Sequence, residues 1–121
     1  MKRMLALAAV AAVALTAVAI ALGATTLSIP ADKTKLAFAK KALTAKAGKV
    51  TLVMPNPSVL PHNVAIRNGT SASSRLIAKG QIVGKGGTSR VTATLKKGRY
   101  RFVCTVPGHE AGGMWGILTI K

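Results

Sequence analysis

The 121-residue sequence contains only one cysteine, two histidines, two acidic residues and four aromatic residues. A single cysteine cannot form a disulfide within the chain. Cys104 is therefore a buried thiol, a reactive thiol, an intermolecular linker or a metal ligand. Few aromatic residues, without a recognition helix or an RNA-binding motif, argue against binding of nucleic acid. The basic residues are scattered along the chain, as expected for a solvated surface.

The shortage of acidic residues makes the protein strongly basic. Eighteen lysines and arginines stand against Asp32 and Glu110, which gives a formal net charge of +16, or +14 without Lys2 and Arg3. Such a surface repels copies of itself and attracts anions over about 8 Å at physiological salt. We therefore expect a monomer whose basic surface binds acidic proteins or an anionic membrane surface.

The one long hydrophobic run lies at the N-terminus. A basic start precedes an apolar stretch over residues 5–22. A cleaved signal peptide has an apolar core of about 7–15 residues, whereas a membrane span needs about 20. Residues 1–24 are thus predicted to be a signal peptide, cleaved after Gly23, or an uncleaved membrane anchor. Both alternatives place the rest of the chain in the periplasm or on the extracellular face of the cytoplasmic membrane.

The remaining residues read as short strands separated by turn residues. Residues 25–35 are predicted to be a linker or an edge strand, and residues 36–121 to form one domain. We expect six to eight strands, among them residues 50–54, a strand ending at the Asn68–Gly69 turn, two strands around Lys97–Gly98, and residues 116–121. Residues 71–80 are expected to loop over the surface. No amphipathic helical segment follows residue 24, so the predicted fold is all-β, a Greek-key antiparallel β-sandwich.

The strand before the cysteine has two informative features. Residues 95–100, Leu-Lys-Lys-Gly-Arg-Tyr, have the spacing of a tyrosine corner, in which a Tyr hydroxyl binds the backbone upstream. Alternation along the strand puts Tyr100, Phe102 and Cys104 on one face. Cys104 therefore points inward at the place where the chain leaves the sheet.

The stretch "CTVPGHEAGGMWG" joins Cys104, His109 and Met114 at five-residue intervals. Proline stiffens such a loop and glycine lets it bend tightly, so the three side chains can converge. Thiolate, imidazole and thioether are soft ligands that suit copper, and a blue copper site adds a second imidazole. The other histidine, His62, opens a predicted strand 42 residues before Cys104, and a sandwich can bring two strand ends together.

"PHNVAI" and "GRYRFVCTVPGHEAGGMWGILTI" resemble the cupredoxins, the small blue copper proteins related to plastocyanin and azurin. The Cys-x4-His-x4-Met spacing is similar to that of auracyanin and rusticyanin. The resemblance implies a Greek-key sandwich that holds one type 1 copper, cycling between Cu(I) and Cu(II), through His62, Cys104, His109 and Met114. It also implies hydrogen bonds between Asn63, after the first ligand, and Thr105, after the cysteine, that join the two ligand segments.

The expected function is that of an exported one-electron carrier, with the His109 ring edge as the place where the electron enters and leaves. The same four ligands would also suit a protein that binds and delivers copper. An oxidase or nitrite reductase needs further copper centres with more histidines, so no enzyme is expected. Zinc also accepts Cys and His, but a Met ligand argues against it. The roles of two neighbours of the ligands stay open. Glu110 is by default a solvated loop charge and alternatively modulates partner docking, and Trp115 fills the core, shields the copper pole or offers a docking surface.

Overall fold

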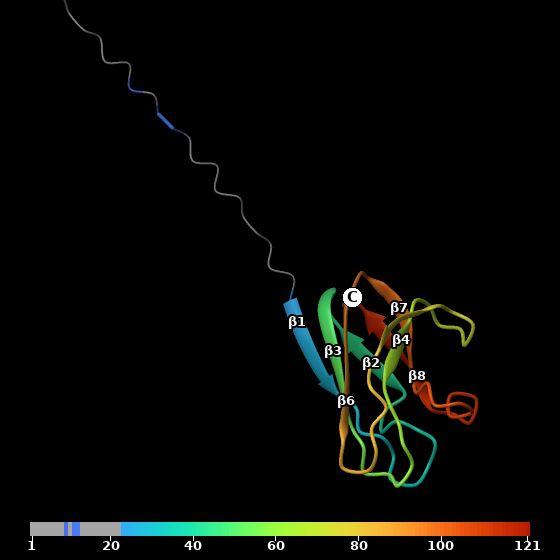
Figure 1. The fold of residues 1–121 in the computed structure, drawn as a ribbon. Coiled ribbons are helices and arrows are strands. Elements are labelled where there is room, and N and C mark those ends of the chain that lie inside the picture. Colours follow the sequence, from blue (N-terminus) through green and yellow to red (C-terminus); the bar gives the residue numbers. More distant parts are fainter. Residues whose placement is uncertain (1–8, 10, 13–22) are drawn as a thin grey trace, which may run out of the picture.

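The computed structural model describes residue 9, residues 11–12 and residues 23–121 (Figure 1). The predicted signal peptide or anchor lies almost entirely outside these residues. Within the part of the chain that is described, no helix is long and apolar enough to span a bilayer. The first strand begins at Gly23, the residue at the predicted cleavage position.

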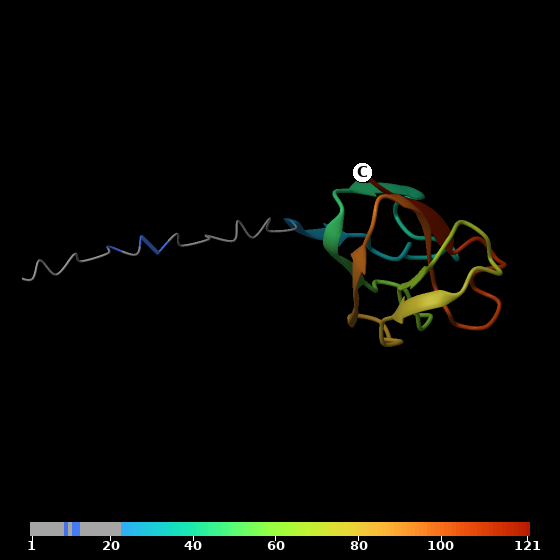
Figure 2. The ribbon, with the colours of Figure 1, turned by 90° about the horizontal axis from the view of Figure 1, so that it is seen from above.

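Eight strands build a sandwich of two sheets. In chain order they are β1 (Gly23–Ser28), β2 (Ala42–Ala45), β3 (Gly48–Pro55), β4 (Ala65–Arg67), β5 (Leu76–Lys79), β6 (Thr88–Leu95), β7 (Gly98–Val103) and β8 (Trp115–Ile120). One sheet has the order β1-β3-β6 and the other β2-β8-β7-β4-β5. The two sheets face each other in Figure 1, and Figure 2 shows the strands surrounding the core from above. The predicted sandwich is confirmed.

Two details differ from the sequence prediction. The pairings β1–β3 and β2–β8 are parallel, while the others are antiparallel. The expectation of a surface loop over residues 71–80 was wrong for its second half, where Leu76–Lys79 forms β5. This strand pairs antiparallel with β4 at the edge of the larger sheet. An edge strand covers little core, which explains why its side chains are mostly exposed although three of the four are apolar.

The core follows the period-two alternation of strands. In β3 the buried residues are Gly48, Val50, Leu52 and Met54, and their neighbours face outward. The rings of Phe38 and Phe102 pack between the sheets with centroids 5.3 Å apart. The cluster continues without a break to the pole where Cys104 and Met114 lie. The ligand positions are therefore part of the rigid core.

The chain on both sides of the site is fixed by specific contacts. The Tyr100 hydroxyl donates a hydrogen bond of 2.8 Å to the carbonyl of Lys96, which confirms the predicted tyrosine corner. In β8, Gly116 lies directly against the ring of Phe102, where a side chain would not fit. These contacts hold the strand that leads into the cysteine and the strand that leaves the methionine.

Candidate metal centre

Neighbouring strands bring the two ligand segments together. Cys104 directly follows β7, and His62 lies shortly before β4, its partner strand. The backbone of His62 exchanges two hydrogen bonds with Val83, of 3.1 and 2.9 Å. The register that pairs Ala65 with Val103 sets the His62 segment beside the residues that follow Cys104. His62 and Cys104, distant in the sequence, thus meet at one pole of the sandwich.

The segment between Cys104 and Met114, here called the ligand loop, folds back on itself. The Cys104 amide donates to the Met114 carbonyl at 3.1 Å, and the Met114 amide donates to the His109 carbonyl at 3.0 Å. Gly108 and Gly113 have φ angles of 81° and 117°, which glycine adopts without strain. The loop therefore returns all three of its predicted ligands to one place.

Three ligand atoms face one another across this pole. The His62 Nδ1 and His109 Nδ1 atoms are 3.1 Å apart, and Cys104 Sγ lies 3.9 Å from the first and 3.6 Å from the second. The point equidistant from the three atoms is about 2.1 Å from each, calculated from these three separations. Metal–imidazole bonds are about 2.0–2.1 Å and metal–thiolate bonds about 2.3 Å. The triangle thus has the size of a three-coordinate metal site.

Met114 supplies the fourth predicted ligand position. Its side chain is fully buried and belongs to the same core cluster as Cys104. Its backbone is hydrogen bonded to both Cys104 and His109. A thioether next to a trigonal set of two imidazoles and a thiolate is the donor combination of a type 1 copper site.

Burial controls the protonation of the ligands in the metal-free protein. Cys104 and His62 are fully buried, whereas His109 is partly exposed. Burial raises the pKa of the Cys104 thiol, and hydrogen bonds from the backbone of Asn63 and Val106 partly offset this. Burial, followed by the nearby His109, lowers the pKa of His62. Among the described residues, the His62 Nε2 atom has no hydrogen-bond partner. His62 is thus kept as a neutral imidazole, the form that binds a metal.

Asn63 and Thr105 join the two segments behind the ligands. The Thr105 amide donates to Asn63 Oδ1 at 2.7 Å, and Asn63 Nδ2 donates to Thr105 Oγ1 at 2.8 Å and to the Gly80 carbonyl at 3.0 Å. Asn63 is fully buried. These bonds fix the residue after His62 to the residue after Cys104, so they set the separation of the two ligands.

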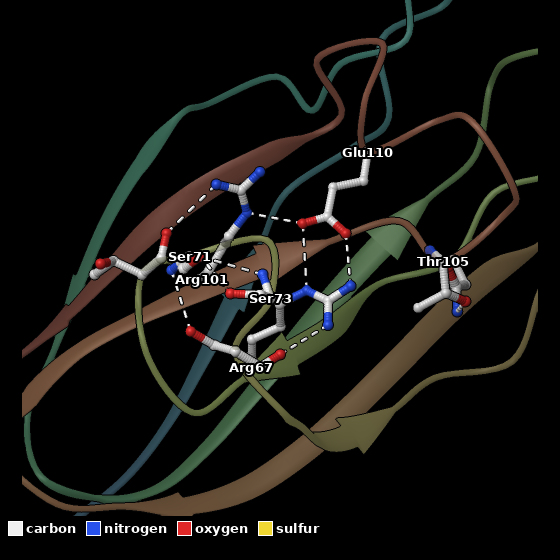
Figure 3. Close-up of polar contacts among 9 residues, drawn as sticks. Arg67, Ser71, Ser73, Arg101, Thr105 and Glu110 are labelled. Carbon is white, nitrogen blue, oxygen red and sulfur yellow. Dashed lines mark hydrogen bonds and ion pairs between the residues drawn. The ribbon is translucent and has the colours of Figure 1, made fainter.

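The sequence did not reveal the partners of Glu110. It forms ion pairs with Arg67 on β4 and Arg101 on β7 (Figure 3). The guanidinium of Arg101 also stacks on the ring of Trp115, 3.9 Å from its centroid. Glu110 is therefore a paired residue and not the solvated charge that its loop position favoured. Trp115 is half-buried beneath an arginine, so it is not simply part of the core.

A Greek-key sandwich whose pole gathers two imidazoles, a thiolate and a thioether defines a small blue copper protein. Comparison with known families agrees, because residues 25–121 match the family described as copper binding proteins, plastocyanin/azurin family. The chain belongs to this family, which comprises small electron carriers and not enzymes. His62, Cys104, His109 and Met114 form its type 1 copper site.

Similar solved structures include two auracyanins with named sources. Auracyanin from the photosynthetic bacterium Roseiflexus castenholzii is 30% identical, with a TM-score of 0.70 over 80% of this chain and 96% of that one. Auracyanin A of Chloroflexus aurantiacus, described as a "blue" copper protein, is 29% identical, with a TM-score of 0.71 over 82% and 100%. An azurin from Methylomonas sp. strain J, 18% identical with a TM-score of 0.64, shares the fold.

A curated relative, chemocyanin of Lilium longiflorum, is 38% identical over 71 residues. The alignment covers 59% of this chain and 53% of the lily protein, so this chain spans about half the length of that relative.

Proposed function

We propose that this protein is an exported one-electron carrier. The observation that carries the proposal is the exposure of the ligands: Cys104, His62 and Met114 are fully buried, and of the four only His109 is partly exposed. Bound copper would supply the redox couple, since it accepts and releases one electron between Cu(II) and Cu(I). The buried ligands exclude water, and His109 offers the shortest route from the site to a partner.

The frame around the site supports fast transfer. His62 is held by Val83, Asn63 joins Thr105, and the ligand loop is closed by the hydrogen bonds of Cys104 and Met114. Ligands that are fixed before the electron arrives need little rearrangement when it does. A low reorganisation barrier is what an electron carrier requires.

Charge indicates the kind of partner. The +14 carried by residues 25–121 would steer acidic redox proteins toward the surface. A hollow of about 400 Å³ lies beside the segment that precedes His62 in the sequence. Its lining includes Lys33, Lys85 and the exposed side chains of Val59 and Leu60. Apolar contact within a basic rim suits a partner whose own docking face is apolar with an acidic rim.

Location and attachment form part of the same proposal. We place the domain in the periplasm or on the extracellular face of the cytoplasmic membrane, released by cleavage or held by its N-terminal segment. The ligand loop lies on the side of the domain away from β1 in both views (Figures 1 and 2). An anchor before Gly23, or contact of the basic surface with anionic lipid on that side, would leave His109 accessible.

Electron self-exchange and copper transfer distinguish carriage of electrons from delivery of copper. We expect rapid exchange between Cu(I) and Cu(II) forms by NMR line broadening, with copper retained in the presence of a competing chelator. Ready loss of copper to the chelator in either oxidation state, with slow self-exchange, would support copper delivery instead. Transfer to an acidic redox protein should slow as salt rises, and a rate independent of ionic strength would refute the steering argument.

A further inference from the structure

Three charged residues form a compact cluster against the ligand loop, here called the Glu110 cluster: Glu110, Arg67 and Arg101. Glu110 Oε1 lies 2.7 Å from Arg67 Nη2, and Glu110 Oε2 lies 2.8 Å from Arg101 Nε and 3.3 Å from Arg67 Nε. The side chains are only 11–17% exposed. Figure 3 shows the carboxylate held between the two guanidinium groups. Paired arginines of this kind bind a carboxylate more strongly than an exposed lysine would.

Both arginines are themselves fixed to the sheet and to a neighbouring loop. They lie on the adjacent strands β4 and β7, at paired positions of the register. Arg67 Nη1 donates to the Ser74 carbonyl at 2.8 Å, and Arg101 Nη1 donates to the Thr70 carbonyl at 3.4 Å. Arg101 also stacks on Trp115. The cluster therefore joins the ligand loop to a surface that cannot move easily.

The ligand loop has little other support on this side. A hollow of about 400 Å³ lies beside it, lined by the Glu110 cluster, by Ala72 and Leu76, and by the loop residues Cys104, Thr105, Val106, Pro107, Gly108 and Ala111. Where side chains leave such a space, packing contributes little to holding this side of the loop, and the ion pairs of Glu110 add to the loop's own backbone hydrogen bonds. Two of the loop residues, Gly108 and Gly113, are glycines with positive φ angles, and they have no side chains that could pack against the rest of the domain.

We propose that Glu110 is a positioning residue for the copper site, acting through its ion pairs with Arg67 and Arg101. It directly follows the ligand His109, and Trp115, stacked on Arg101, directly follows the ligand Met114. One guanidinium thus touches the chain next to both ligands without touching any ligand atom. The cluster holds His109 in one place when the copper changes its oxidation state. This inference rests on the proposed electron-carrier function.

The test compares Glu110→Gln and Arg101→Gln with two matched controls in the whole protein. Asp32→Asn makes the same charge change as Glu110→Gln at the other acid, which is partly exposed, lies outside the cluster and accepts hydrogen bonds from the amides of Thr34 and Lys35. Arg99→Gln makes the same change as Arg101→Gln at an exposed position of the same strand. Hydrogen exchange of the Gly113 and Met114 amides, which bond within the loop, reports loop opening in the metal-free and Cu(I) forms.

We expect exchange of these two amides to accelerate about tenfold in both cluster variants, as the loss of one charge-assisted contact would produce. The controls should exchange like the wild type. The electron self-exchange rate should fall several-fold in the cluster variants, and their blue absorption band should shift. Arg101→Lys, which keeps the charge but loses the planar fork, should restore only part of the protection.

Unchanged exchange and unchanged spectra in folded cluster variants would overturn the positioning role. Faster exchange with unchanged spectrum and self-exchange would also overturn it, because the cluster would then serve stability alone. If Glu110→Gln fails to fold, Arg101→Gln and Arg67→Gln carry the same comparison. A wild type that exchanges electrons slowly refutes the proposed function, whereas the amide exchange still decides whether the cluster holds the loop.

Discussion

Removal of the Asn63 side chain should strongly destabilise the metal-free protein. In Asn63→Ala, the Thr105 amide and the Gly80 carbonyl lose their partners, and so does the Thr105 hydroxyl. Asn63 is fully buried, so water does not replace it freely. Each buried group left without a partner costs about 1–3 kcal/mol, and we expect a total loss of about 3 kcal/mol. With a slope near 1.2 kcal/mol/M, the urea midpoint would fall by about 2.5 M.

Two further variants separate the contributions. Thr105→Val removes only one acceptor and should cost about 1 kcal/mol. Thr51→Val is the matched control, because the hydroxyls of Thr51 and Thr92 bond at 2.9 Å between strands on the exposed surface. Its cost should stay below about 0.5 kcal/mol. If urea unfolding gives Asn63→Ala and Thr51→Val the same stability, the argument that Asn63 joins the ligand segments is refuted.

Four more predictions concern the strand frame, the fourth ligand and the protonation of Cys104 and His62. Tyr100→Phe removes the bond to the Lys96 carbonyl and should cost about 1 kcal/mol, or about 5 °C in Tm by calorimetry; an unchanged Tm would contradict this. Met114→Leu should change the stability of the protein by less than about 1.5 kcal/mol. The same variant should have a higher reduction potential in voltammetry, because it loses the thioether that stabilises Cu(II). A lower potential would refute Met114 as a ligand. Burial raises the pKa of Cys104, so copper binding near neutral pH should release a proton and weaken about tenfold per pH unit of acidification, which calorimetry in two buffers measures. Because the pKa of His62 is lowered from 6.5 in the folded protein, the His62 imidazole binds a proton in the unfolded chain at a pH at which it is still neutral in the folded chain. Stability of the metal-free protein should therefore fall as pH drops below about 6.5, and a flat pH profile of urea midpoints would contradict this.

The ligands were readable from the sequence because they are chemically rare. Cys104, His109 and Met114 are evenly spaced among turn residues, and His62 is the single remaining histidine. The tyrosine corner was also readable, since its contact spans only four residues from Lys96 to Tyr100. The spacing of residues that are close in the sequence predicts the ligand loop and the tyrosine corner. The repetition of short strands predicts the fold class.

Long-range contacts could not be read in the same way. Arg67 and Glu110 are 43 residues apart, and Arg67 is one of eighteen similar cations. Only the strand register brings it beside Arg101. Likewise, β5 was missed because an edge strand needs little hydrophobic alternation, and its pairing with β4 appears only in three dimensions.

The visible spectrum tests the central claim most directly. We expect the metal-free protein to turn blue on addition of one equivalent of Cu(II), with an intense band near about 600 nm from charge transfer between the Cys104 thiolate and copper. The Cys104→Ser variant should lack this band. A protein that stays colourless and binds no copper would contradict the type 1 site formed by His62, Cys104, His109 and Met114.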